Sequence, residues 1–285
     1  MPDRTWTVRE VIEWSAGDFK ARNIESARLD AELLVAQALG IDRIGLYLDL
    51  ERPLVDEERA AVRTLVTRRR AREPVAYILG HRDFYGRRFL VNHSVLIPRP
   101  DTEVLVERAL EQIPVDETRA VLDVGTGSGA VALTLAAERP LATVTATDLS
   151  ASALEVARSN AEAMELLERV EFQEADIVNH AGTYDVVVSN PPYVTRGEHE
   201  ALEPEVRDHE PELALVAGED GLDVIRRLLS ECLPVTRRKG ELLVEVGAGQ
   251  ADAVRRLVDE RDAWEFVDTY DDLQGIARVV HLRRT

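Results

Sequence analysis

Val121-Leu122-Asp123-Val124-Gly125-Thr126-Gly127-Ser128-Gly129 joins a short apolar strand to a helix through three glycines, and this junction indicates the fold class. A strand that enters a helix through such a loop is typical of the first βα unit of a fold that binds a nucleotide-like ligand. The spacing here is G-x-G-x-G, whereas the dinucleotide fingerprint is G-x-G-x-x-G. The carboxylate of Asp123 just before the loop disfavours phosphate and favours a cationic ligand. A glycine-rich loop can also be a simple turn, so its surroundings carry the argument.

Downstream of this stretch, short β-branched runs alternate with helical segments. This alternation predicts a mainly parallel, seven-stranded, Rossmann-like α/β sheet with helices on both faces. The connection over residues 270–276 is short, so the last two strands should form an antiparallel pair at one side of the sheet. The expected strands are Val121–Val124, Thr143–Thr147, Val170–Gln173, Tyr184–Ser189, Glu241–Val246, Trp264–Thr269 and Ala277–Leu282, and the helices are Ala130–Glu138, Ala151–Ala163, Leu222–Cys232 and Ala251–Val258.

The N-terminal part of the chain has a different pattern. From Val8 to about Arg72 the apolar residues recur at helical spacing, which predicts a bundle of four or five helices. The run Arg68-Arg69-Arg70-Ala71-Arg72 is interpreted as the solvated face of one of these helices. Two short alternating runs around Gly86 then predict a β-hairpin linker. We expect Asp101 to cap the amphipathic helix that follows.

Composition limits the possible functions. The chain has 285 residues, of which 45% are hydrophobic and 31% charged, as in ordinary globular proteins. Its net charge of −18 argues against binding along a nucleic-acid backbone. One cysteine and six histidines without ligand spacing predict no metal site and no internal disulfide. Without an apolar run of membrane-spanning length or an apparent leader, we expect a cytoplasmic, monomeric protein that contacts no membrane.

Three residues at strand ends are candidate ligand contacts. Asp148 ends the second expected strand, about 20 residues after the glycines, where a carboxylate can accept hydrogen bonds from both ribose hydroxyls. The alternative role for Asp148 is to cap the next helix, although Ser150 could do this instead. Asp176 follows the third strand and could accept the amino group of adenine. Ile177 could pack on the adenine ring.

Asn190-Pro191-Pro192-Tyr193 follows the fourth strand and should lie at the same carboxyl edge of the sheet as the glycine loop. Two prolines end the strand and supply no backbone N–H, so nearby carbonyls turn toward a ligand. The Asn190 side-chain oxygen and the Pro191 carbonyl can accept the two N–H groups of a planar amide or amine. Tyr193 can stack on that group. Two prolines alone also occur in a plain strand-terminating turn.

Together these groups predict a methyl-transfer site. S-adenosylmethionine carries a sulfonium and an ammonium group, which suit the acidic mouth of the glycine loop. An amide nitrogen is a poor nucleophile, so an enzyme must hold it in line with the sulfonium methyl. The two acceptors become more favourable as positive charge grows on that nitrogen. No strong base is required, because the methylated nitrogen is acidic.

With these residues in hand, the chain resembles the HemK/PrmC family of peptide chain release factor glutamine methyltransferases along nearly its whole length. The segments that carry the resemblance are Arg28-Leu29-Asp30-Ala31-Glu32-Leu33-Leu34, Glu73-Pro74-Val75-Ala76-Tyr77-Ile78-Leu79-Gly80, Phe84, Phe89, Leu96-Ile97-Pro98-Arg99-Pro100-Asp101-Thr102-Glu103, Asp123-Val124-Gly125-Thr126-Gly127-Ser128-Gly129, Ser189-Asn190-Pro191-Pro192-Tyr193, Glu210-Pro211, Ala214-Leu215 and Asp220-Gly221-Leu222-Asp223. Where some members have a tryptophan against the adenine, this chain has Ile177.

The resemblance implies methyl transfer from S-adenosylmethionine, leaving S-adenosylhomocysteine, to the side-chain amide nitrogen (N5) of the glutamine in the Gly-Gly-Gln motif of class I release factors, a step in translation termination. It implies a helical substrate-recognition domain over residues 1–80, a hairpin linker over 81–94 and a catalytic methyltransferase domain over 95–285. By position, Gly125, Thr126, Gly127, Ser128, Gly129, Asp148, Asp176, Ile177 and Asn190 would contact the cofactor, and Asn190, Pro191, Pro192 and Tyr193 would bind the glutamine, with Asn190, Pro191 and Tyr193 catalytic.

Three alternatives stay open. The same clamp could hold the exocyclic amine of a flipped adenine in DNA or RNA, which the acidic chain disfavours. A sister family with a similar catalytic domain methylates a glutamine in a ribosomal protein. A third possibility is a binding module that regulates by docking, but such a protein would not need Asn190 and Tyr193.

Overall fold

The chain forms two units, which are described separately. The computed structural model describes residues 5–179, 182–260 and 262–285, so the first four residues of the predicted helical domain lie outside the described part. The helical unit comprises Met1–Gly80 and Pro204–His209. The sheet unit comprises His81–Glu203 and Glu210–Thr285. A six-residue segment from the C-terminal half of the chain therefore belongs to the helical unit.

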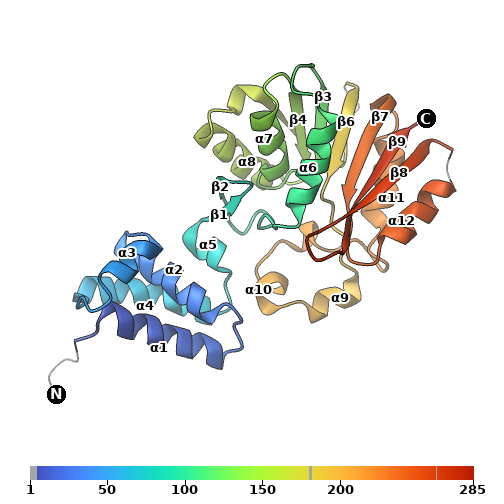
Figure 1. Cartoon of the computed structure of the whole chain (residues 1–285). Coiled ribbons are helices and arrows are strands. Elements are labelled where there is room, and N and C mark those ends of the chain that lie inside the picture. Colours follow the sequence, from blue (N-terminus) through green and yellow to red (C-terminus); the bar gives the residue numbers. More distant parts are fainter. Residues whose placement is uncertain (1–4, 180–181, 261) are drawn as a thin grey trace. The chain divides into compact units, whose positions relative to one another are not determined.

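The helical unit is a bundle built around an apolar core. Its first helix begins with a capping box, in which Thr7 accepts a hydrogen bond from the backbone N–H of Glu10 and the Glu10 carboxylate accepts one from the N–H of Thr7. Phe19, Leu34 and Val62 are among the buried residues that pack between the helices. The helices are α1 (Val8–Ala21), α2 (Ala27–Leu39), α3 (Arg43–Leu48), α4 (Asp56–Arg70), α5 (Val75–Leu79) and, from the distant segment, α10 (Pro204–Arg207) (Figure 1).

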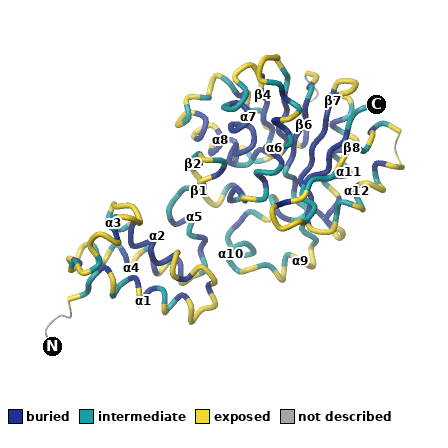
Figure 2. The backbone as a smooth tube through the Cα atoms, viewed as in Figure 1, coloured by how far each residue is buried: buried dark blue, intermediate teal, exposed yellow. Residues whose placement is uncertain are grey.

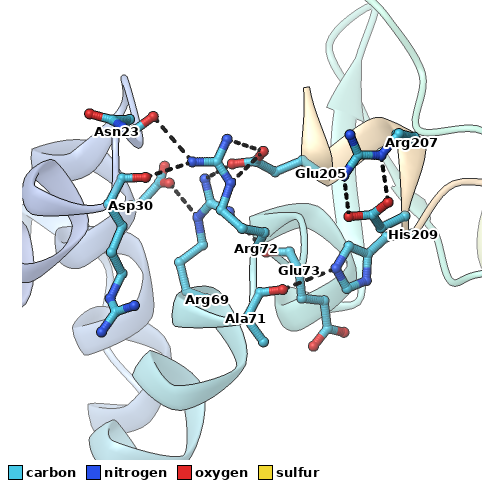
Figure 3. A network of polar contacts seen from close by, with 11 residues as sticks. Asn23, Asp30, Arg69, Ala71, Arg72, Glu73, Glu205, Arg207 and His209 are labelled. Atoms are coloured by element: carbon cyan, nitrogen blue, oxygen red, sulfur yellow. Dashed lines mark hydrogen bonds and ion pairs between the residues drawn. The ribbon is translucent and has the colours of Figure 1, made fainter. Parts of the chain in front are cut away.

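A polar network holds α10 within the helical unit (Figure 3). The guanidinium of Arg69 donates to Asp30 and to Glu205, each at 2.7 Å. Arg72 donates to the other oxygen of Glu205 at 2.8 Å. Arg69 is only 4% exposed, so the interpretation of the basic run as a fully solvated helix face is wrong for this residue. Burial is tolerated because two carboxylates compensate the charge.

The sheet unit contains a mixed sheet whose strand order in the described part is β5-β4-β3-β6-β7-β9-β8. The first five of these strands run parallel, and β9 is antiparallel to both of its neighbours. Their bounds are β3 (Ala120–Val124), β4 (Thr143–Asp148), β5 (Val170–Glu174), β6 (Tyr184–Ser189), β7 (Thr236–Glu245), β8 (Trp264–Asp271) and β9 (Ala277–Arg284).

Helices cover both faces of this sheet (Figure 1). Along β3 and β6 successive side chains alternate between two cores: Val121 and Val186 pack with one set of helices, and Leu122 and Val187 with the other. Figure 2 shows β4, β6 and β7 as buried along most of their length, which is why these strands are rich in apolar residues. One face carries α6 (Thr102–Gln112), α7 (Ala130–Glu138) and α8 (Ala151–Ala163), and the other carries α11 (Asp223–Glu231) and α12 (Ala251–Asp259).

Shorter elements complete the unit. A hairpin turns at Tyr85 and Gly86, both of which have positive φ. The bounds of these elements are β1 (His81–Phe84), β2 (Arg87–Leu90), α9 (Arg196–Ala201) and the single 3-10 turns η1 (Leu167–Arg169) and η2 (Glu212–Ala214). Within the described residues no helix is both long and apolar enough to cross a membrane.

The predicted fold class is confirmed: a mainly parallel seven-stranded sheet with an N-terminal helical bundle. Two local expectations are wrong. β7 begins at Thr236, five residues before the predicted start, and the three residues after Thr236 are exposed and charged. The side chain of Asp101 makes no capping hydrogen bond to α6 and instead pairs with Arg278 of β9 at 3.1 Å.

Candidate active site

A cavity of the sheet unit lies where the carboxyl ends of β3, β4 and β6 meet. This is the point at which the strand order reverses, since β3 is followed along the sheet by β4 on one side and β6 on the other. The cavity has a volume of about 260 Å³. Its lining includes Gly125, Thr126, Gly127, Ser128, Asp148, Asp176, Ile177, Asn190, Pro191 and Pro192. Gly129 and Tyr193, which were also predicted as site residues, are not among the lining residues.

The glycine loop is held against β4. The backbone N–H groups of Gly125 and Thr126 both donate to the carbonyl of Thr147 at 2.9 Å. Gly125, Gly127 and Gly129 all have positive φ, a conformation that other residues adopt only with strain. Gly129 precedes α7, where an added Cβ would lie 3.0 Å from Leu133. Gly129 therefore allows the glycine loop to pack closely against α7.

Asp123 organises the loop from below. Its side chain is 1% exposed, and one carboxylate oxygen accepts hydrogen bonds from the Thr126 hydroxyl at 2.7 Å and the Ala132 N–H at 3.1 Å. Burial raises the pKa of Asp123 to about 7. Asp123 also lines the cavity. A positive group in the cavity would favour its ionised form.

Asp148 stands at the end of β4 beside the glycine loop. Its carboxylate accepts hydrogen bonds from the N–H of Gly127 at 2.8 Å and of Ser150 at 2.9 Å. Burial raises the pKa of Asp148, although these two hydrogen bonds oppose the effect. The cap of α8 is Ser150, whose hydroxyl accepts from the N–H of Ala153 at 3.2 Å. Asp148 is therefore not needed as a helix cap.

Asp176 and Ile177 form the wall next to β5. Asp176 is paired with Arg227 of α11 at 2.9 Å and is about half exposed. Ile177 is buried, has a φ of 69°, and its carbonyl accepts a hydrogen bond from the Thr147 hydroxyl at 2.8 Å. That hydrogen bond holds the residue in its left-handed conformation. Ile177 and Asp176 both line the cavity.

Asn190 comes directly after β6 and has one defined partner. Its side-chain Nδ2 donates to the hydroxyl of Thr102 at 3.1 Å. The preceding Ser189 is buried and donates to the Val124 carbonyl at 2.8 Å, which fixes the strand end to β3. With Nδ2 occupied by Thr102, Oδ1 is the atom of Asn190 that can accept from a ligand.

Tyr193 lies against two glycines, Gly221 and Gly247, and against the side-chain amide of Gln250. Its carbonyl accepts a hydrogen bond from Gln250 Nε2 at 2.9 Å. An added Cβ at Gly221 would lie 2.2 Å from that carbonyl oxygen, and one at Gly247 would lie 3.1 Å from the tyrosine ring. Burial, with the nearby charge of Glu245, raises the pKa of Tyr193 to about 12, so the phenol stays neutral.

The cationic side chains that line the cavity are already compensated. Arg99 donates to the buried carboxylate of Glu210 at 2.5 Å, and Glu210 also accepts from the N–H of Ile97 at 3.1 Å. Arg227 pairs with Asp176 and with Glu231. The charges left at the glycine loop are therefore those of Asp123 and Asp148. Such a mouth suits a cationic ligand better than a phosphate.

Three residues close to the predicted clamp were not assigned a role from the sequence. Thr102 holds Asn190, Gln250 holds Tyr193, and Glu245 is 1% exposed beside both. Glu245 could have been predicted from the sequence, because it is a carboxylate at the end of an apolar strand, as Asp148 is. The partners of Thr102 and Gln250 are too distant in sequence to be predicted.

Comparisons with known proteins agree with this architecture. The PrmC N-terminal domain family matches residues 10–80, and the methyltransferase small domain family matches residues 100–206. The catalytic domain of hMettl16, solved with an RNA hairpin, covers 81% of this chain and 84% of its own, with a TM-score of 0.57 and 15% identity, which supports the fold alone.

Full-length relatives define the family. A release factor glutamine methyltransferase from Geobacter sulfurreducens is 44% identical over 96% of both chains. One from Rhodopirellula baltica is 37% identical over 99% of this chain and 98% of its own. Both matches run through the helical unit, the glycine loop and the Asn-Pro-Pro-Tyr segment. This chain therefore belongs to the HemK/PrmC family of release factor glutamine methyltransferases.

Proposed function

We propose that this protein transfers a methyl group from S-adenosylmethionine to the side-chain amide nitrogen (N5) of the glutamine in the Gly-Gly-Gln motif of class I peptide chain release factors. The observation that supports this most is the shared cavity, which is lined both by the glycine loop and by Asn190, Pro191 and Pro192. A methyl donor and an amide acceptor must meet at one place, and this cavity offers a wall for each.

The residues present fit S-adenosylmethionine. The cofactor, when bound, supplies an electrophilic methyl group on a sulfonium. Asp123 and Asp148 leave negative charge at the glycine loop, where the sulfonium and ammonium groups would lie. Asp148 would accept the ribose hydroxyls. Asp176 and Ile177 would contact the adenine, the first as a hydrogen-bond acceptor and the second by packing.

The acceptor side follows from Asn190. Its Oδ1 would accept one N–H of the glutamine amide and the Pro191 carbonyl the other, which holds the nitrogen in line for transfer. Both acceptors interact more strongly as the nitrogen becomes positive, so they stabilise the transition state. Tyr193, kept neutral by burial, would stack on the amide plane. The proton released after transfer can leave to solvent without a dedicated base.

The choice of a release factor rests on the relatives and on the helical unit. The relatives that match over the full chain are named for release factor glutamine methylation, and their similarity includes residues 10–80. We therefore assign substrate recognition to the helical domain over residues 1–80, with residues 81–94 as a hairpin linker and 95–285 as the catalytic domain.

A labelling assay tests the proposal. Purified protein is incubated with methyl-labelled S-adenosylmethionine and, in separate reactions, a class I release factor, its Gly-Gly-Gln variant with Gln changed to Ala, DNA, and ribosomal protein. Label should enter the intact release factor alone. Asn190→Ala should bind S-adenosylmethionine normally and lose turnover by about 10²–10³-fold, as removal of a transition-state acceptor does. Equal labelling of the Gln-to-Ala factor, or preferential labelling of DNA or ribosomal protein, would contradict the proposed substrate.

A further inference from the structure

A buried carboxylate lies beside the acceptor segment without a role in binding or transfer. In the parallel pair of β6 and β7, Ser189 is in register with Val244, so Asn190 and Glu245 are the next positions at the same edge. Glu245 is 1% exposed, and its Oε2 has no hydrogen-bond partner among the described residues. Burying an ionisable group in such a place costs free energy, so we expect Glu245 to have a function.

Thr102 connects this carboxylate to Asn190. As the first residue of α6, it is 4% exposed and accepts a hydrogen bond from Asn190 Nδ2 at 3.1 Å. A hydroxyl has one proton to donate. The Thr102 side chain also acts on Glu245, where it lowers the pKa of the carboxyl group against the effect of burial. A donation from the Thr102 hydroxyl to that carboxylate would extend the chain from the amide of Asn190 through Thr102 to Glu245.

The direction of this chain depends on the charge of Glu245. An ionised carboxylate can only accept, so in this chain Thr102 donates to Glu245 and accepts from Asn190. Nδ2 of Asn190 then faces Thr102, and Oδ1 is left for the acceptor. If position 245 could donate, Thr102 could donate to Oδ1, and the Asn190 amide would present its NH₂ to the N–H groups of the substrate.

We propose that Glu245 is a positioning residue for methyl transfer, which acts through Thr102 to hold the Asn190 side chain with its oxygen toward the acceptor amide. The inference rests on the proposed function, because it assigns Asn190 the role of hydrogen-bond acceptor. Glu245 itself touches neither the methyl donor nor the acceptor in this account, and it does not line the cavity.

The charges around Glu245 determine when it is ionised. Burial raises the pKa of Glu245 to about 7, and Thr102 and the guanidinium groups of Arg278 and Arg99 oppose that effect. Asp101 raises the pKa further, and neutral Tyr193 lies next to the carboxylate. These groups come from β9, from the segment before α6 and from the segment after β6. The orienting form of Glu245 is therefore favoured at pH values above about 7.

The test compares four variants with the wild-type protein, using a class I release factor and labelled S-adenosylmethionine. Glu245→Gln keeps the shape but can donate, and Thr102→Val removes the hydroxyl; Thr102→Ser restores it. Glu241→Gln is the matched control, because Glu241 lies on the same strand and accepts from His281 and Arg283. For each protein kcat, the KM for both substrates, the Kd for S-adenosylmethionine and Tm are measured from pH 6 to 9.

The expected results separate positioning from folding. Glu245→Gln and Thr102→Val should lower kcat by about tenfold or more, with the Kd for S-adenosylmethionine changed by less than about twofold. Thr102→Ser and Glu241→Gln should stay within about threefold of wild type. The fall of wild-type kcat below about pH 7 should be absent in Glu245→Gln. Its Tm at pH 8 should not fall, because the variant removes a buried charge.

Two outcomes overturn the inference. One is a Glu245→Gln enzyme with wild-type kcat and pH profile. The other is a loss of kcat that follows a loss of Tm equally in Glu245→Gln and Glu241→Gln, which indicates a structural role alone. Failure of the proposed function is distinguishable from both, since in that case the wild-type protein itself does not methylate the release factor glutamine.

Discussion

The carboxylate of Glu205 lies between two guanidinium groups, accepting from Nη2 of Arg69 at 2.7 Å and from Nε of Arg72 at 2.8 Å. His209, at the other end of the same segment, is hydrogen-bonded to the Ala71 carbonyl at 3.2 Å. Directly after it the chain re-enters the sheet unit at Glu210, and Pro211 and residues just beyond it line the cavity. These contacts anchor residues 204–209 in the helical unit (Figure 3).

Removing this anchor should destabilise the helical unit. Glu205→Ala leaves the buried Arg69 with Asp30 as its remaining carboxylate partner, so we expect a loss of about 1–3 kcal/mol in the free energy of unfolding and faster amide exchange over residues 204–209. Glu51→Ala is the control, because Glu51 pairs with Arg9 at 2.7 Å while three-quarters exposed. It should change stability by less than about 0.5 kcal/mol. Equal effects of the two changes in urea unfolding would contradict the role of Glu205.

Gly221 should be required for the position of Tyr193. It has a φ of 73°, and an added Cβ would lie 2.2 Å from the Tyr193 carbonyl oxygen. Gly221→Ala should therefore displace the Asn-Pro-Pro-Tyr segment and lower kcat by at least about tenfold. Gly275→Ala has a similar φ of 77° but open space around the added Cβ, so it should cost about 1 kcal/mol of stability and leave kcat intact. Steady-state kinetics and thermal melts of both variants check this: a local clash at Gly221 lowers kcat, whereas backbone strain alone lowers only the stability.

Asp148 should determine cofactor affinity. Asp148→Asn keeps the size of the side chain but loses the charge that faces the cavity and one acceptor for the ribose hydroxyls, so the Kd for S-adenosylmethionine should rise about tenfold or more. Glu174→Gln is the control, because Glu174 is the exposed last residue of β5 and does not line the cavity. Isothermal titration calorimetry measures both. Unchanged affinity in Asp148→Asn would exclude the ribose contact.

The pH dependence of stability should change in Glu245→Gln. Burial raises the pKa of Glu245 to about 7, above its ordinary value of 4.5. Between these values the folded protein binds more protons than the unfolded chain, so the contribution of this group to the free energy of unfolding falls as the pH rises. Relative to wild type, the free energy of unfolding of Glu245→Gln should therefore rise by about 1.4 kcal/mol for each pH unit between these two pKa values, up to about 3 kcal/mol by pH 8. Urea unfolding at pH 5 and pH 8 checks the sign, and a variant that loses stability toward pH 8 would refute it.

The sequence predicted those parts of the sheet that depend on local pattern. The bounds of α7, α8 and β6 are as predicted, because each is an uninterrupted apolar or amphipathic run with a glycine, serine or proline at or next to at least one of its ends. The start of β7 was missed, since its first half carries Arg237, Arg238 and Lys239, which hide a strand that is still paired through Thr236.

Contacts between distant parts of the chain could not be predicted. Asp101 occupies a cap position by sequence, but Arg278 of β9 attracts its carboxylate. The burial of Arg69 depends on Asp30 and Glu205, and the orientation of Asn190 depends on Thr102. In each case the partner is distant in the sequence and is brought close by the tertiary structure, so a local sequence pattern cannot identify it.

Locating the transferred methyl group tests the proposed function at the level of single atoms. A class I release factor is incubated with the wild-type protein and S-adenosylmethionine, digested, and analysed by tandem mass spectrometry, with the Asn190→Ala protein as the parallel reaction. The expected result is the mass of one added methyl group on the glutamine of the Gly-Gly-Gln peptide, at its side-chain amide, and almost none with Asn190→Ala. A methyl group on any other residue, or equal methylation by Asn190→Ala, would contradict it.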